Sequence, residues 1–185
     1  MIPYLTKDQI ARVDDLAINK YNIQIEKLME NAGRNMAQFI IKKFPKSNQI
    51  IILIGKGNNG GDGLVTARHL QIANKNPTIV LATKPDQLNN TSKKELDILK
   101  KINILPTNFP NINKINKSTI IIDSLIGYNL TNNPKPEFAD LIFKANQAKK
   151  QGAKIISFDL PSGMHASTAQ EATPTIQANY TLTLA

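Results

Sequence analysis

The sequence contains no cysteine, only two histidines and few aromatic residues. Without cysteine the chain has no disulfide bond and no thiolate zinc site, and two histidines supply too few ligands for an ordinary zinc enzyme. Aromatic side chains make up 5% of the chain, which leaves little material for stacking nucleic-acid bases. No run approaches the roughly 20 apolar residues of a membrane span, and the first residues lack the pattern of a signal peptide. We therefore expect a cytoplasmic protein with no membrane partner.

The chain is basic, with a formal net charge of +9. Such a charge attracts anionic ligands, nucleotides among them. The lysines are scattered in pairs along expected helices, which is typical of solvated helix faces, so we expect no nucleic-acid partner. The 185 residues have the length of one domain. Because no internal repeat or linker divides them, we expect residues 1–185 to form a single domain.

Hydrophobic patterns predict strands that alternate with helices along the chain. The runs 49–55 and 118–123 are continuously apolar, as in strands buried on both faces of a parallel sheet. Alternation of this kind predicts an α/β fold with right-handed crossovers and helices on both faces of the sheet. The other expected strands are 77–82, 104–105, 153–158 and 180–185, and the expected helices are 7–20, 24–43, 62–73, 92–102 and 137–150. Capping boxes at Thr6–Gln9 and Ser92–Glu95 are predicted to open two of these helices.

A glycine-rich segment follows the first long strand. Gly55 to Gly60 satisfies Gly-x-Gly-x-x-Gly between a strand and a helix, a placement in which backbone N–H groups approach phosphates. The segment is not an ordinary dehydrogenase fingerprint, because the next strand does not end in an acid that would hold a ribose. Asp62, at the expected start of the helix, would also repel a pyrophosphate. On this pattern alone Asp62 is equally well explained as a helix N-cap or as a functional acid.

Three acids follow the ends of expected strands: Asp62, Asp123 and Asp159. Since the carboxyl ends of parallel strands meet at one edge of a sheet, we expect these side chains to converge there. Asn59, Asp123 and Ser162 would offer hard oxygen ligands for potassium, sodium or magnesium. A carboxyl group of the same cluster could instead transfer a proton.

Four segments taken in order resemble the YjeF N-terminal domain family, the NAD(P)H-hydrate epimerases. They are 28–33 (Leu-Met-Glu-Asn-Ala-Gly), 57–70 (Asn-Asn-Gly-Gly-Asp-Gly with Ala-Arg-His-Leu), 122–127 and 158–163. The resemblance implies a Rossmann-like three-layer αβα sandwich with a mostly parallel central sheet, commonly dimeric. It implies interconversion of the R and S forms of hydrated NADH and NADPH, which carry a hydroxyl at C6 of the reduced nicotinamide ring. A separate dehydratase would use the product, because we expect no dehydratase domain in this chain.

The resemblance also assigns residues. It places a potassium ion among Asn59, Asp123 and Ser162, and gives the catalytic proton transfer to Asp159 with support from Asp62. The residues that it assigns to the hydrated dinucleotide are Asn58, Asn59, Gly60, Gly61, Asp62, Gly127, Tyr128, Asn129, Leu130 and Asp159.

Two loops depart from the family pattern. Gly127-Tyr-Asn129 stands where relatives usually have Gly-Thr-Gly, and 164–169 lacks two acids and a glycine. His165 in the second loop is better explained as an ordinary loop residue than as a replacement acid–base group. These departures and the basic charge leave an alternative, a binding or scaffold module that holds nucleotide or RNA without turnover. Glu30 and Asn31 are read either as polar groups of a helix or as support for the site or a dimer surface.

Overall fold

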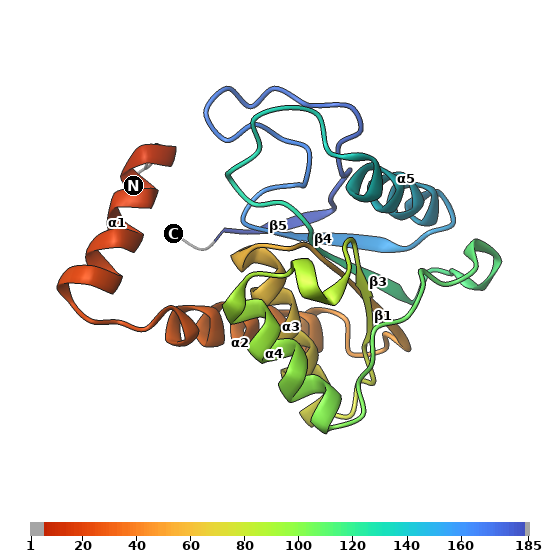
Figure 1. Ribbon diagram of the computed structural model, residues 1–185. Helices are drawn as coiled ribbons and strands as arrows, with labels where there is room; N and C mark the ends of the chain where they lie inside the picture. Colours follow the sequence, from red (N-terminus) through yellow and green to blue (C-terminus); the bar gives the residue numbers. More distant parts are fainter. Residues whose placement is uncertain (1–5, 184–185) are drawn as a thin grey trace.

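The computed structural model describes residues 6–183 and contains a five-stranded sheet of order β2-β1-β3-β4-β5 (Figure 1). Every neighbouring pair of strands is parallel, so the predicted α/β fold with a parallel sheet is confirmed. The strands are β1 Gln49–Ile54, β2 Thr78–Leu81, β3 Thr119–Ser124, β4 Lys154–Phe158 and β5 Tyr180–Leu182. The helices are α1 Lys7–Asp15, α2 Ile25–Lys43, α3 Asn58–Ile72, α4 Asn90–Lys101 and α5 Pro136–Lys150.

Helices cover both faces of the sheet and complete three layers. Successive residues of β1 point to opposite faces, so Ile50, Ile52 and Ile54 pack under α2, α3 and α4, whereas Ile51 and Leu53 pack under α5. Figure 1 shows α5 on one side of the strands and the other three helices on the opposite side. This arrangement explains why β1 is apolar without alternation: both of its faces are buried.

The register of the sheet brings three chain segments to one edge. Leu53 of β1 lies beside Asp123 of β3, and Asp123 lies beside Ser157 of β4. Because all three strands run the same way, the loops that follow them leave the sheet together. The polar residues predicted at these strand ends are therefore neighbours in space.

Three local predictions are wrong. The helix predicted from 62 begins at Asn58, so most of the glycine-rich segment is its first turn. The helix predicted from a cap at Ser92 begins at Asn90, because the side chain of Asn89 accepts the hydrogen bond from Ser92 N and acts as the cap instead. Residues 104–105 form no strand, and only an isolated bridge joins Ile79 to Pro106 there.

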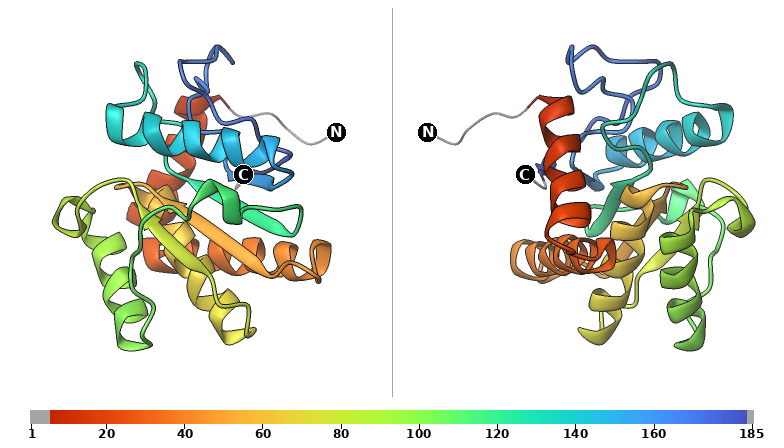
Figure 2. Two further views of the ribbon diagram at one scale, coloured as in Figure 1. Left: turned by 90° about the vertical axis from the view of Figure 1, so that its right-hand side faces the viewer. Right: turned by 60° about the vertical axis from the view of Figure 1, so that its left-hand side comes forward.

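The first helix stands apart from the body of the molecule (Figures 1 and 2). Its predicted capping box is present, with Thr6 and Gln9 exchanging hydrogen bonds. A π-helical turn over Leu16–Lys20 continues it. Val13 of this helix is 52% exposed, whereas Ile10 and Asp14 are partly covered. Across residues 6–183, no helix is both long and apolar enough to cross a membrane.

Candidate functional site

The glycine-rich segment brings the amino end of α3 against the end of β1. Gly57 is the N-cap of the helix, and Asn58, Asn59, Gly60 and Gly61 form its first turn. A Cβ at Gly60 would collide with the carbonyl oxygen of Gly55, so only glycine permits this close approach. The N–H groups of a first helical turn have no partner within the helix and favour an anion.

Asp62 lies one turn into α3 and is not its N-cap. The residue is 7% exposed. Burial, together with the charges of Asp159 and Asp14, raises its pKa well above the ordinary value. A carboxyl group in this setting keeps its proton at a pH where an exposed aspartate has lost it. The raised pKa lessens the tendency of Asp62 to carry a charge that would repel a phosphate at the helix end, which weakens the objection raised by its charge.

Asp159 occupies a strained turn directly after β4. Its φ is +59°, a left-handed conformation that few residues other than glycine adopt, and its N–H donates to Leu182 O at 2.7 Å. Burial raises the pKa of its carboxyl, the backbone N–H of Tyr128 lowers it, and the charge of Asp14 raises it. Strained non-glycine residues of this kind are frequent at functional sites.

Gly127 is the point at which the three loops meet. A Cβ placed on Gly127 would lie 3.5 Å from Asp159 Oδ2 and 3.7 Å from Asn59 Cβ. The structure therefore brings together Asn59, Asp62, Gly127 and Asp159, residues that the sequence assigned to one site.

Asp123 lies beneath this group and is fully buried. Its Oδ2 accepts hydrogen bonds from Ser157 Oγ at 2.8 Å and from Ser162 N at 2.9 Å. Its Oδ1 accepts from Ser162 Oγ at 2.6 Å and from Leu125 N at 3.2 Å. Burial raises the pKa of Asp123, and these donors oppose the increase. Asp123 thus joins β3, β4 and the turn after β4, and so fixes the backbone that carries Asp159.

Of the oxygen ligands predicted for a cation, Asn59 has a free end, whereas Asp123 and Ser162 already have hydrogen-bond partners. One end of the Asn59 amide, assigned as Nδ2, is buried and has no hydrogen-bond partner. A half-turn of the amide would present its oxygen there instead. Asp123 and Ser162 are in direct contact, but the four donors around Asp123 occupy its usual acceptor positions, so an ion would replace at least one of them. Over the described part of the chain, no group of three or more histidine, aspartate or glutamate side chains has a metal-binding arrangement.

Two polar groups at the site were missed by sequence reasoning. Asp14 comes from α1, and its Oδ2 accepts a hydrogen bond from the hydroxyl of Tyr128 at 3.4 Å. Nothing in the helical pattern of α1 marks Asp14 as different from its neighbour Asp15. Ser157, the partner of Asp123, did leave a signal, since it is a hydroxyl within the apolar run of β4.

The remaining residues assigned to the substrate lie on the outer part of the site. Asn58 is exposed and its Oδ1 accepts a hydrogen bond from Asn89 Nδ2 at 2.7 Å. Asn129 is exposed and Leu130 is partly buried. Gly61 faces the other way, since a Cβ there would meet Met29 and Ser92.

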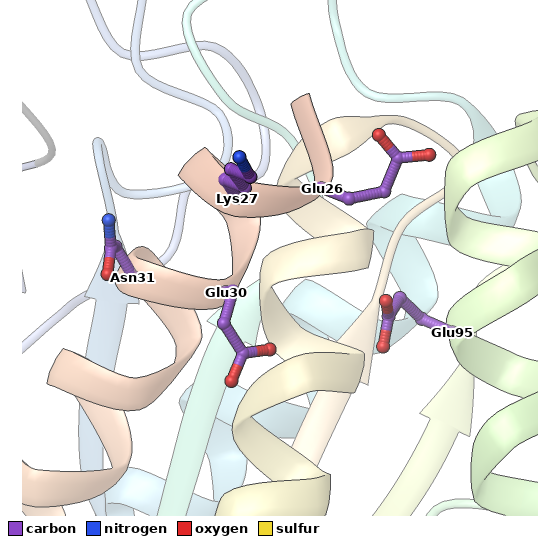
Figure 3. A pocket seen from close by; sticks show the side chains of 5 residues that line it. All are labelled: Glu26, Lys27, Glu30, Asn31 and Glu95. Carbon is purple, nitrogen blue, oxygen red and sulfur yellow. The ribbon is translucent and has the colours of Figure 1, made fainter. Parts of the chain in front are cut away.

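A separate groove of about 450 Å³ lies between α2 and α4 (Figure 3). Its lining includes Glu26, Glu30 and Glu95. Glu30 binds Arg68 and also His69 Nε2, the latter at 2.7 Å, so two of the segments that resemble the family are joined here. Arg68 also lies 3.6 Å from Glu95. These ion pairs tie α2, α3 and α4 together.

Comparison with known proteins agrees with this geometry. The family model described as YjeF-related protein N-terminus matches residues 25–185. An NAD(P)H-hydrate epimerase of Rhodopirellula baltica is 31% identical, over 100% of this chain and 75% of the relative. One of Lentilactobacillus buchneri is 35% identical, over 100% of this chain and 84% of the relative.

Two further comparisons bear on domain organisation and fold. A bifunctional NAD(P)H-hydrate repair enzyme Nnr of Thermofilum pendens is 29% identical, over 95% of this chain and 34% of the relative. A yeast crystal structure, of YNL200c, superposes with a TM-score of 0.84 at 22% identity, covering 97% of this chain and 79% of that one, which confirms the three-layer fold. On the match of the family model and the identity to the epimerases, this chain belongs to the YjeF-related N-terminal family.

Proposed function

We propose that this chain is an NAD(P)H-hydrate epimerase, an isomerase that interconverts the R and S forms of hydrated NADH and NADPH. The observation that carries the proposal is the pairing of Asp62 and Asp159 at the carboxyl edge of the sheet, beside the amino end of α3. Full-length relatives bear the name of this activity. The reaction needs a group that can give a proton to oxygen and take one back, and the two coupled carboxyls meet that need.

The two ends of the substrate have different requirements. Its phosphates would lie against the first turn of α3, where the N–H groups of Asn58 to Gly60 and the helix dipole favour negative charge. Gly127 to Leu130 would cover the dinucleotide from the opposite side. The hydrated ring would then reach Asp159, which the Gly127 loop contacts.

The reaction moves one proton from a carboxyl group to the substrate and later returns one to it. At C6 the hydroxyl and the ring nitrogen share one carbon, so the nitrogen lone pair can form a C=N bond as the C6–O bond breaks. A protonated carboxyl gives its proton to the leaving hydroxyl, which departs as water. Water then adds to the other face of C6 and returns a proton to the carboxylate. We assign this transfer to Asp159, with Asp62 as the neighbouring proton store, because burial raises the pKa of both acids and the charge of Asp159 raises that of Asp62 further.

The direct test incubates the purified chain with separated epimers of hydrated NADPH and follows their interconversion by chromatography. Wild-type protein should bring either epimer to the equilibrium mixture. Asp159→Asn should abolish the reaction while the circular dichroism spectrum stays unchanged. Asp15→Asn removes a charge from an exposed helix position and serves as the control. Equal rates for Asp159→Asn and wild type would remove Asp159 from the mechanism, and binding without turnover by wild type would favour the binding-module alternative.

We further propose one potassium ion per subunit, held by Asn59, Asp123 and Ser162. Support comes from the unpartnered end of the buried Asn59 amide and from an all-oxygen set, which suits a hard cation. When bound, the ion would supply positive charge beneath the loops that carry the acids. Replacing potassium by sodium in the buffer should lower the thermal midpoint of wild type and leave that of Asn59→Ala unchanged. An identical response of both proteins to the exchange would contradict the assignment.

We also propose that two copies form a dimer, and that a separate dehydratase uses the product. Val13, in α1, and Leu16, in the π-helical turn that follows it, are exposed large apolar side chains that a second copy would cover. Val13→Lys combined with Leu16→Lys should give a monomer in analytical ultracentrifugation, whereas Phe143→Lys, on exposed α5 surface, should not.

We place the reaction in the cytoplasm, since a chain without cysteine is compatible with a reducing compartment.

A further inference from the structure

The face of α1 that is turned toward the body carries an acid. From Asp8 to Asp15 no side chain is buried, and only Ile10 and Asp14 are partly covered. These two residues are one helical turn apart and so lie on the same face. Val13, one residue before Asp14, is 52% exposed. Hydrophobic burial accounts for Ile10, but the partial burial of the Asp14 carboxyl group calls for a polar partner.

The described contacts of α1 point to the epimerase site. Within residues 6–183 the helix packs extensively against no element except the π-helical turn that continues it. Its side-chain link to the body is the hydrogen bond from Tyr128 Oη to Asp14 Oδ2, at 3.4 Å. The backbone N–H of Tyr128 in turn faces the carboxyl of Asp159. One residue therefore touches the first helix on one side and the proposed catalytic acid on the other.

Asp14 is also electrically close to the reacting groups. Its charge contributes to the raised pKa values of Asp62, Asp159 and Tyr128. The effect of one charge on the pKa of another group is strong only over short distances. The Asp14 carboxyl group thus lies near Asp62 and Asp159.

We infer that α1 forms the outer wall of the substrate site and that Asp14 is a substrate-positioning residue, which accepts a hydrogen bond from the hydrated nicotinamide end of the dinucleotide. The inference rests on the proposed epimerase function. An ionised carboxylate only accepts hydrogen bonds and repels phosphate, so its partner is a neutral donor. The nicotinamide end offers such donors in its carboxamide N–H groups and ribose hydroxyls. The Tyr128 hydroxyl holds Asp14 in place before substrate arrives.

Two matched pairs of variants test this inference. Asp14→Asn is compared with Asp15→Asn, which removes the same charge from the exposed neighbouring position. Tyr128→Phe is compared with Tyr21→Phe, a hydroxyl on a side chain that is 65% exposed. Asp14→Asn keeps an acceptor oxygen but removes the charge, and Asp14→Ala removes the acceptor as well. The alanine variant should raise the KM for hydrated NADPH about threefold to tenfold, the effect of one lost hydrogen bond, and Asp14→Asn should raise it by less, with kcat of both within about twofold of wild type. Asp15→Asn should change neither constant by more than about twofold.

Hydrogen exchange of the free protein provides a second measurement that needs no turnover. Backbone amides of residues 8–15 should exchange faster in Tyr128→Phe than in Tyr21→Phe, because only the first variant loses the link to Asp14. The inference is overturned if Asp14→Ala has the KM of Asp15→Asn, or if the two tyrosine variants exchange alike. A wild-type chain without turnover would instead end the proposed function, and the exchange comparison would still decide whether Tyr128 holds α1.

Discussion

Asp62 and Asp159 are coupled across the carboxyl edge of the sheet: the charge of Asp159 adds to burial in raising the pKa of Asp62. Asp62 lies near the start of α3 and Asp159 in the turn that follows β4. Burial is the largest cause of the raised pKa of each acid. The site exists because parallel strands deliver both segments to the same place.

This coupling predicts that Asp62 destabilises the fold at neutral pH. The folded-state pKa of Asp62 lies above its ordinary value of 3.8, so both states hold the proton below pH 3.8. As pH rises past that value the unfolded chain releases its proton first, and stability falls until the folded-state pKa is reached. Asp62→Asn, which cannot ionise, should therefore have a larger free energy of unfolding than wild type at pH 8.

Urea unfolding at pH 3 and pH 8 measures this difference. The gain of Asp62→Asn should vanish at pH 3, where wild type is protonated in both states. Asp15→Asn, at an exposed position, should show no such gain. A variant that is less stable than wild type at pH 8 would show that neighbouring groups stabilise the buried carboxylate more than burial and repulsion disfavour it.

The close approach at the start of α3 predicts an asymmetry between two glycines. Gly60→Ala should destabilise the fold by about 1–3 kcal/mol, because the new Cβ meets the carbonyl oxygen of Gly55. Gly57→Ala should have little effect, since a Cβ there would meet nothing within 4 Å. Thermal midpoints of the two variants provide the comparison. Equal losses would mean that backbone freedom, and not space, decides both positions.

The hydrogen bond from Ser157 of β4 to Asp123 predicts that Ser157 supports the fold and the position of Asp159. Ser157→Ala removes one donor from a fully buried carboxylate and should cost about 1–3 kcal/mol of unfolding free energy. It should also lower epimerase activity, because Asp123 fixes the turn that carries Asp159. Ser167→Ala, on an exposed loop position, is the control. Loss of stability with full activity would show that Asp159 is positioned independently of Asp123.

The ion pairs of the α2–α4 groove predict a non-additive double substitution. Arg68→Ala leaves Glu95, which is 8% exposed, without a nearby positive charge and should destabilise the fold by about 2 kcal/mol. Adding Glu95→Gln should restore part of that loss, since a neutral amide costs less to bury. Lys100→Ala, which breaks an exposed pair with Asp97, should change stability by less than about 0.5 kcal/mol. Additive effects of the first two substitutions would show that Arg68 acts through Glu30 alone.

Sequence reasoning located the strands and the functional segments but not every boundary. The apolar runs of β1 and β3 are unambiguous because only a strand buried on both faces is apolar without alternation. The start of α3 was misplaced because a run of glycine and asparagine looks like a loop, although here close contact with Gly55 and the end of β1 holds it in a helix. The family resemblance rested on side-chain identity and did not depend on that boundary.

What the sequence by itself determined is the alternation of apolar strands and helices, and with it an acid after each of three strands. The alternation follows from hydrophobic burial, which depends on the order of residue types along the chain, and the acids are read directly from the sequence. Only the tertiary structure decided that Asp62 and Asp159 lie near one another while Asp123 is enclosed by hydrogen bonds. It also decided that Asp14 is partly covered while Val13, on the same helix, is exposed. These outcomes depend on register, close backbone contact and distances between charges, which are set only when distant segments pack together.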